Sequence, residues 1–258
     1  MAEKLTISLI QSDLYWEDPK SNRKKFESII NKLPETDIIL LPELFTTGFT
    51  MDVKNNSEGI EGPSVVWMHD MAKKNAAAMC GSLIIEDGGN YYNRLFFISP
   101  DGLLGTYDKR HLFRMGDEHM NYTTGRQRVI IDYKGWRVLP QICYDLRFPV
   151  WSRNRGDYDL YINVANWPAS RQHIWTTLLA ARAIENQCYV VGLNRVGIDG
   201  TGLDHCGNTM LADYKGRTIK SIPYGEEGHF TETIDLKEQN AFKERFPAYL
   251  DADEFKIT

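Results

Sequence analysis

Short, continuous apolar runs are the feature of this sequence that most limits its fold. Residues 37–41 (DIILL), 136–142 (WRVLPQI) and 159–164 (DLYINV) are apolar with little alternation. A strand with this pattern is covered on both faces, whereas a strand with one face in water alternates polar and apolar side chains. The sequence therefore predicts sheets that are buried beneath other layers.

Helical patterns alternate with the strands in the first and third quarters of the chain, and hairpin-like strand pairs interrupt them. Apolar residues at helical spacing predict helices over 20–32, 65–75 and 173–187, with a shorter one from Phe148 to about Asn154. This order predicts a single α/β domain with mixed sheets, and no GxGxxG follows the first strand as in a Rossmann domain. Strands are expected over residues 5–10, 37–41, 78–86, 94–99, 103–107, 129–133, 136–142, 159–164, 189–196, 209–213, 218–222 and 230–236.

Composition and charge exclude several classes of function. The net charge is −5 and no block of Lys or Arg stands out, so we expect no nucleic-acid partner. We also expect no membrane span and no signal peptide, because the apolar runs are only strand-sized. The cysteines are far apart and form no CxxC pair, which argues against structural zinc and disulfides and favours a reducing cytoplasm.

Cys143 stands where the strand 136–142 stops. Pro149 suits the first turn of a helix, so Cys143 is expected at a sharp strand-to-helix turn. Backbone N–H groups and the positive end of a helix dipole at such a turn favour the thiolate, which is the nucleophilic form. The alternative for any single cysteine is a small buried hydrophobe. That alternative is our interpretation of Cys80, Cys188 and Cys206.

Two other reactive side chains also end predicted strands. Glu43 follows DIILLP and Lys109 follows LLGTYD. In open α/β sheets, ligands gather at the carboxyl ends of strands. A carboxylate there can take a thiol proton and return it to a leaving amine, and an ammonium can stabilise an oxyanion. Each group alone is equally typical of a solvated surface, but with Cys143 they predict acyl transfer.

The segments around these three residues together resemble the nitrilase, or carbon–nitrogen hydrolase, superfamily. They read LLPELFTTGF, YDKRHLF and QICYDLRFP, and the order Glu, Lys, Cys also matches. The resemblance covers nearly the whole chain and implies a four-layer α-β-β-α sandwich that pairs into larger assemblies. It implies Glu43 as general base, Lys109 as stabiliser of the intermediate and Cys143 as nucleophile, with no metal or organic cofactor. A homodimer is expected, and residues 237–258 would form a tail that packs on the body or at the subunit interface.

The superfamily also has a second glutamate on the loop between the lysine and the cysteine. Glu118 in GDEHMNYTTG is the best match, and Asp117 is the competing choice. This residue would orient Lys109 or position the attacking water.

Four further stretches look most like the ω-amidase branch of the superfamily: KRHLFRMGDEH, CYDLRFPVWSRN, VANWPASR and ARAIENQ. Enzymes of that branch hydrolyse the terminal amide of 2-oxoglutaramate or 2-oxosuccinamate to the 2-oxo diacid and ammonia. The resemblance implies a thioester intermediate on Cys143, with the oxyanion held by Lys109 and the backbone N–H of Tyr144. Glu43 would protonate the leaving ammonia and activate the water.

The far end of such a substrate carries a carboxylate next to a ketone, for which a bidentate arginine is the natural receptor. Arg171 and Arg195 are candidates. Arg147 lies nearest to Cys143, but we favour a structural salt bridge with Asp145 for it. Phe113, Tyr144 and Trp167 are candidates for the pocket wall.

Other readings of the sequence remain open. Metal-dependent phosphodiesterases with an α-β-β-α sandwich would use Glu43, Asp145, Asn163 and His205, but the spacing fits no metal motif and Cys143 is left unexplained. A catalytically silent interaction protein is a third class. Within the superfamily, hydrolases of N-carbamoyl amides or of other short amides share the triad and differ in the pocket.

Overall fold

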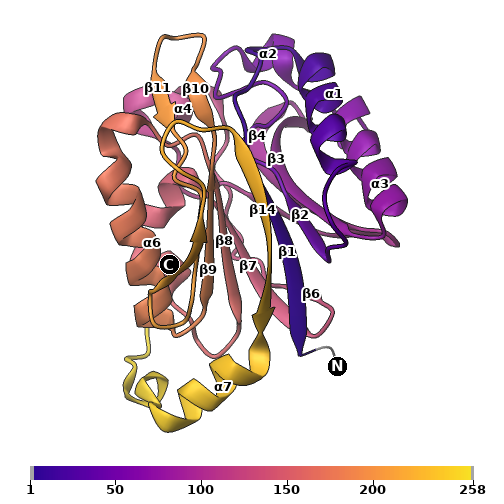
Figure 1. The fold of residues 1–258 in the computed structure, drawn as a ribbon. Coiled ribbons are helices and arrows are strands. Elements are labelled where there is room, and N and C mark those ends of the chain that lie inside the picture. Colours follow the sequence, from indigo (N-terminus) through magenta and orange to yellow (C-terminus); the bar gives the residue numbers. More distant parts are fainter. Residues whose placement is uncertain (1–2, 257–258) are drawn as a thin grey trace.

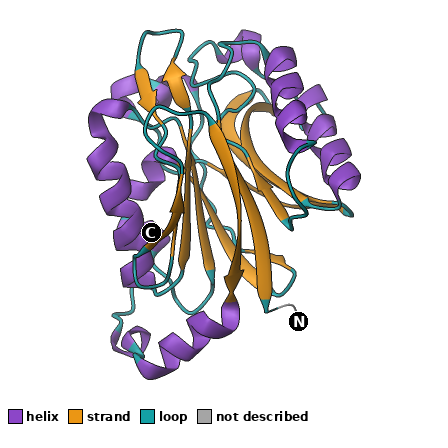
Figure 2. Ribbon diagram, in the orientation of Figure 1, coloured by secondary structure: helices purple, strands orange, loops and turns teal. Residues whose placement is uncertain are grey.

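Two sheets lie face to face in the centre of the molecule, with helices on both outer sides (Figures 1 and 2). The structure, a computed structural model, describes residues 3–256. Helices α1 (Pro19–Ile30) and α3 (Pro63–Asn75) cover one side, and α6 (Gln172–Asn186) covers the other. This confirms the predicted α-β-β-α sandwich with mixed sheets.

The first sheet has the strand order β14-β1-β2-β3-β4-β5. Its central strands β1, β2 and β3 are parallel, and the outer pairings are antiparallel. Short turns join β3 to β4 and β4 to β5, as expected for hairpin-like strand pairs. The bounds are β1 (Lys4–Gln11), β2 (Ile38–Leu40), β3 (Ala78–Asp87), β4 (Asn90–Ser99), β5 (Gly102–Asp108) and β14 (Gly228–Asp235).

The second sheet repeats this plan with the order β13-β12-β9-β8-β7-β6. Its parallel strands are β7, β8 and β9, and its outer pairings are antiparallel. Strands β10 (Val196–Ile198) and β11 (Asp204–Cys206) form a separate hairpin beyond the end of β9. The bounds are β6 (Ile131–Tyr133), β7 (Trp136–Ile142), β8 (Leu160–Ala165), β9 (Tyr189–Asn194), β12 (Met210–Ala212) and β13 (Thr218–Ser221).

Apolar side chains fill the space between the sheets and the space beneath the helices. On β1, Ile7 and Leu9 belong to the cluster between the sheets, whereas Ile10 belongs to the cluster beneath α1 and α3. Phe26 of α1 and Met68 of α3 complete that second cluster. Burial of each such side chain contributes about 1.5–3 kcal/mol, so strands apolar on both faces are stabilised from both sides.

The structure corrects the predicted elements in two places. The helix expected from Phe148 to Asn154 is only α5 (Pro149–Ser152), and a 3₁₀ turn over Cys143–Arg147 precedes it. The polar tail expected after residue 236 begins with helix α7 (Leu236–Arg245), because the Asp235 side chain accepts hydrogen bonds from the first N–H groups of the helix. Short helices α2 (Val53–Asn56) and α4 (Glu118–Asn121) lie in segments where we expected no helix.

None of the helices within residues 3–256 combines the length and the apolar composition that crossing a bilayer requires.

Candidate active site

Glu43, Lys109 and Cys143 follow the ends of β2, β5 and β7, and the fold brings them together. All three side chains are buried, with exposed fractions of 0%, 1% and 9%. The Lys109 Nζ lies 2.8 Å from Glu43 Oε1, and Lys109 and Cys143 line the same cavity. The predicted meeting of a nucleophile, a carboxylate and an amine is therefore present in the structure. Their catalytic roles stay predictions.

Glu118 is the fourth member of this cluster. Its Oε1 lies 2.9 Å from Lys109 Nζ, and its Oε2 accepts a 2.6 Å hydrogen bond from the backbone N–H of Phe113. The neighbouring Asp117 is exposed and has a left-handed backbone (φ 54°) at the start of α4. Glu118, and not Asp117, is thus the carboxylate in contact with the lysine.

The charges of this buried cluster determine the protonation of Lys109. Burial alone would lower the pKa of the ammonium, but Glu118 and Glu43 outweigh it and raise the pKa of Lys109 well above its ordinary value. Burial raises the pKa of Glu118, against the opposing effect of Lys109. Lys109 is therefore a permanent cation, suited to stabilise an oxyanion and unsuited to act as a base.

Two asparagines that we did not single out from the sequence hold the Glu43 carboxylate. Asn93 Nδ2 donates to Glu43 Oε1 at 2.8 Å, and the backbone N–H of Asn166 donates to Glu43 Oε2 at 2.7 Å. Asn166 directly follows the carboxyl end of β8, the same signal that identified Cys143. Asn93 is a fully buried residue of β4, and a buried amide there needs a polar partner.

The backbone at Cys143 has φ 45°, so the chain turns sharply at this residue. This confirms the predicted sharp turn, but the expectation of a resting thiolate is wrong. Burial and the adjacent Glu43 raise the pKa of Cys143 well above its ordinary value, against the opposing effect of Lys109. The following 3₁₀ segment has only five residues, too short for its dipole to overcome burial.

We predict that Cys143 is a neutral thiol at pH 7. The difference in ultraviolet thiolate absorbance between the wild type and Cys143→Ala should be absent at pH 7. At about pH 8.5, the pKa of an ordinary cysteine, this absorbance difference should still be smaller than that of a fully ionised thiol. Full thiolate absorbance at pH 7 would contradict this assignment, and denatured protein provides the control with an ordinary titration.

Asp145 links two segments of the site: the turn that holds Cys143 and the loop that holds Glu118. Its Oδ2 accepts hydrogen bonds from Tyr107 Oη (2.8 Å) and the backbone N–H of Ile142 (3.1 Å). Its Oδ1 contacts both the backbone N–H (2.9 Å) and Nδ1 (2.7 Å) of His111. The salt bridge that we expected between Asp145 and Arg147 is absent from the described part of the chain, because these other donors fill both oxygens.

Replacing Asp145 by asparagine should destabilise the protein by about 1–3 kcal/mol, because one donor is left facing an amide NH₂ in a buried site. Urea unfolding measures this loss. The matched control is Asp132→Asn at the exposed position of β6, expected within about 0.5 kcal/mol of wild type. Equal stability of the two variants would contradict the role of Asp145.

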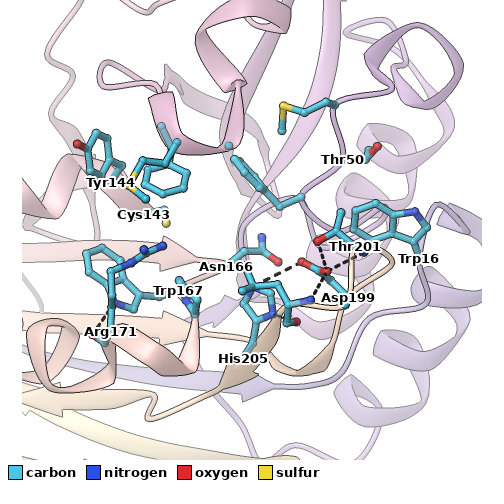
Figure 3. Close-up of a pocket in the computed structure, with 18 of the residues that line it drawn as sticks. Trp16, Thr50, Cys143, Tyr144, Asn166, Trp167, Arg171, Asp199, Thr201 and His205 are labelled. Atoms are coloured by element: carbon cyan, nitrogen blue, oxygen red, sulfur yellow. Dashed lines mark hydrogen bonds and ion pairs between the residues drawn. The ribbon is translucent and has the colours of Figure 1, made fainter.

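A cavity of about 670 Å³ opens above Cys143 (Figure 3). Four of the predicted substrate-binding residues line it: Phe113, Tyr144, Trp167 and Arg171. Arg147 also lines it. The guanidinium of Arg171 lies over the Phe113 ring (5.2 Å) and that of Arg147 over Trp167 (5.4 Å).

Arg195 is the predicted binding residue that the structure places elsewhere. It does not line the cavity, its side chain is fully buried, and Nη2 donates to Asp13 Oδ1 at 2.6 Å. Its Nε donates to the carbonyl of Val196. The position at the end of β9 was correctly predicted, but the side chain points away from Cys143 into an ion pair.

The residues of the phosphodiesterase alternative do not form one site. In the described part of the chain, no three His, Cys, Asp or Glu side chains are placed to hold a metal ion. Asp145 is bonded to Tyr107 and His111, whereas Asn163 Nδ2 donates to Tyr161 within β8.

The comparisons with known proteins agree with this site. A family model described as carbon-nitrogen hydrolase matches residues 6–244. The chain belongs to the carbon–nitrogen hydrolase family. It is therefore a hydrolase acting on carbon–nitrogen bonds, which decides against the phosphodiesterase and against a silent interaction protein.

Individual relatives match over nearly their whole length. "Omega-amidase YafV" of Yersinia enterocolitica is 43% identical over 253 residues, 98% of each chain. "2-oxoglutaramate amidase" of Bacillus subtilis is 34% identical, over 96% of this chain and 97% of that one. The crystal structure of XC1258 from Xanthomonas campestris, a CN-hydrolase superfamily protein with an arsenic adduct in its active site, has 42% identity and a TM-score of 0.97. That likeness covers 100% of both chains. The carbon–nitrogen hydrolase family predicted from the three motifs, and its ω-amidase branch, are confirmed.

Proposed function

We propose that this carbon–nitrogen hydrolase cleaves the terminal amide of 2-oxo acid monoamides, 2-oxoglutaramate and 2-oxosuccinamate, to the 2-oxo diacid and ammonia. The observation that carries the proposal is the cavity that Cys143 lines together with two arginines, Arg147 and Arg171. A planar guanidinium binds a carboxylate through two parallel hydrogen bonds. The relatives named ω-amidase and 2-oxoglutaramate amidase support the same substrate class.

Acylation begins with transfer of the Cys143 proton to Glu43, whose carboxylate lies against the thiol. The thiolate then attacks the amide carbon, and the carbonyl electron pair moves to the oxygen. Lys109 and the backbone N–H of Tyr144 stabilise this oxyanion. When the carbonyl re-forms, the carbon–nitrogen bond breaks, Glu43 returns its proton to the nitrogen, and ammonia leaves a thioester behind.

Deacylation repeats these steps with water as the nucleophile. Glu43 takes a proton from water, the hydroxide adds to the thioester carbon, and the carbon–sulfur bond breaks as the carbonyl re-forms. The departing Cys143 sulfur receives the proton from Glu43, which restores the thiol. Glu118 keeps the Lys109 ammonium in place through both halves of the reaction.

Ammonia release from four compounds tests the proposal: 2-oxosuccinamate, 2-oxoglutaramate, N-carbamoyl-β-alanine and a simple nitrile. Turnover of the 2-oxo amides, absent in Cys143→Ala, is the expected result. Turnover of the carbamoyl compound alone would retain the Glu-Lys-Cys triad and overturn the substrate assignment.

Arg171→Met should raise KM for 2-oxosuccinamate by about 10–100-fold, since a charge-assisted hydrogen bond contributes about 1.5–3 kcal/mol. The change in kcat should be smaller, because Arg171 binds the end of the substrate remote from the reacting carbon. Succinamate, which lacks the ketone but keeps the carboxylate, should show the same rise. An unchanged KM would assign the carboxylate to Arg147 instead.

We further propose that the enzyme is a cytoplasmic homodimer built from a single domain. Four free, buried cysteines suit a reducing compartment. Exposed apolar side chains just beyond α7 support a subunit interface there, namely Phe246, Tyr249 and Leu250. Sedimentation of the full chain and of a Leu250→Glu variant tests this, with a dimer expected only for the wild type.

A further inference from the structure

The wall of the cavity away from Arg171 has a different chemistry. In Figure 3, Asn166, His205 and Asp199 lie towards one side of the view, and Arg171, Cys143 and Tyr144 lie towards the other. All three line the cavity and are at least nine-tenths buried, with exposed fractions of 6%, 2% and 8%. Neither the acyl-transfer steps nor carboxylate binding uses the side-chain oxygen of Asn166 or the ring of His205.

The contacts of Asn166 determine which way its amide faces. Nδ2 lies 2.7 Å from the backbone oxygen of Glu43 and 3.4 Å from its Oε2. A carbonyl and a carboxylate accept hydrogen bonds, so the NH₂ group must face them. The Oδ1 atom therefore points away from Glu43, and it has no hydrogen-bond partner among residues 3–256. It is a buried acceptor next to the catalytic carboxylate.

The contacts of His205 determine its tautomer in the same way. Nδ1 lies 3.1 Å from the carbonyl oxygen of Leu203, which cannot donate, so Nδ1 carries the proton. Burial and the cation of Arg195 lower the pKa of His205, so the ring is neutral at pH 7. Its Nε2 is then an acceptor, and it lies 3.9 Å from Asp199 Oδ2, too far for a hydrogen bond.

The fold holds this wall rigidly. His205 pairs through its backbone with Pro168, two residues beyond Asn166. Asp199 Oδ1 accepts bonds from the N–H and Oγ1 of Thr201 and from the N–H of Leu203, which fixes the β10–β11 loop. A Cβ added at Gly200 would lie 2.4 Å from the Trp16 ring, so the loop packs directly on that ring.

We propose that Asn166 Oδ1 and His205 Nε2 bind the nitrogen of the substrate amide and hold ammonia as it leaves. Both atoms accept and neither donates, so their ligand must supply hydrogen-bond donors. A primary amide has two N–H bonds to offer while Glu43 protonates the nitrogen lone pair. An ester offers only oxygen lone pairs to the same atoms and is repelled. The site would thus select primary amides, a preference that adds to the proposed function and rests on its mechanism.

The test compares one amide with its own methyl ester. The amide is the one that the wild type hydrolyses fastest, so the identity of that amide tests the proposed function separately. His205→Leu removes the acceptor, and the ratio of kcat/KM for the amide to kcat/KM for the ester should fall about tenfold. His205→Gln keeps an acceptor oxygen and should recover part of the ratio. The control His173→Leu, on the exposed side of α6, should leave the ratio at its wild-type value.

Inhibition by ammonium chloride provides a second measurement, with sodium chloride at equal ionic strength as control. The inhibition constant of ammonium should be about tenfold lower for the wild type than for His205→Leu. A loss of amide and ester activity in equal proportion, with unchanged ammonium inhibition, would reduce His205 to a structural residue and overturn the proposal.

Discussion

Cys143→Ala should lower amide hydrolysis by at least about 10⁴-fold while the protein stays folded. The reason is that Cys143 is the one cysteine among the described residues that lines the cavity. Cys80 and Cys188 are fully buried, and burial raises their pKa. Alanine tolerates the φ of 45° at this position as well as cysteine does, so the turn should be retained.

Two measurements on this variant and one on the wild type separate the chemical role of the thiol from its structural role. Circular dichroism and urea unfolding should match the wild type within about 1 kcal/mol. Mass spectrometry of the wild type, quenched during turnover, should show an acyl adduct on the Cys143 peptide. Substantial activity of Cys143→Ala, or an adduct on another cysteine, would overturn the mechanism.

Lys109→Met should cause the largest loss of stability, about 3–5 kcal/mol at pH 7, together with loss of activity. Glu43 and Glu118 would then face each other in a dry site without a cation. Two buried carboxylates that share a site cannot both stay ionised, so at least one pKa rises above the unfolded value of about 4.3.

The pH dependence of the unfolding free energy follows from that rise. A group whose folded pKa is raised stabilises the fold below its unfolded pKa, and this contribution is lost as pH increases through the folded pKa. The unfolding free energy of Lys109→Met should therefore be closest to that of the wild type near about pH 5, and the deficit should grow towards about pH 8. The control Lys134→Met removes a half-exposed ion pair with Asp37 and should cost at most about 1 kcal/mol at either pH. A deficit of Lys109→Met that is independent of pH would contradict the assignment.

The sequence was informative wherever local pattern and burial agree. The apolar runs at 136–142 and 159–164 became β7 and β8 because strands buried on both faces tolerate few polar residues. The three strand ends identified Glu43, Lys109 and Cys143 because parallel strands deliver their ends to one edge. The motifs around them then indicated the family, which the comparisons confirmed.

What the sequence could not reveal depends on contacts between distant segments. Arg195 and Arg171 looked equivalent, and only the three-dimensional fold shows Asp13 next to one and the cavity next to the other. The neutral thiol of Cys143 follows from burial and the neighbouring Glu43, which together outweigh the local turn. Helix α7 was missed because its apolar face is short and its strongest signal is the cap at Asp235.

The enclosure of Lys109 between two carboxyl groups has a consequence for turnover. When the Cys143 proton moves to Glu43, one anion disappears as another forms a few ångströms away, so the total charge of the enclosed groups stays constant. The amide group of the substrate, water and ammonia are also neutral when they reach and leave these groups, and the substrate carboxylate pairs with an arginine in the proposed mechanism. Dehydration of the charges of Glu43, Lys109 and Glu118 is therefore met once when the chain folds and is not repeated in each catalytic cycle.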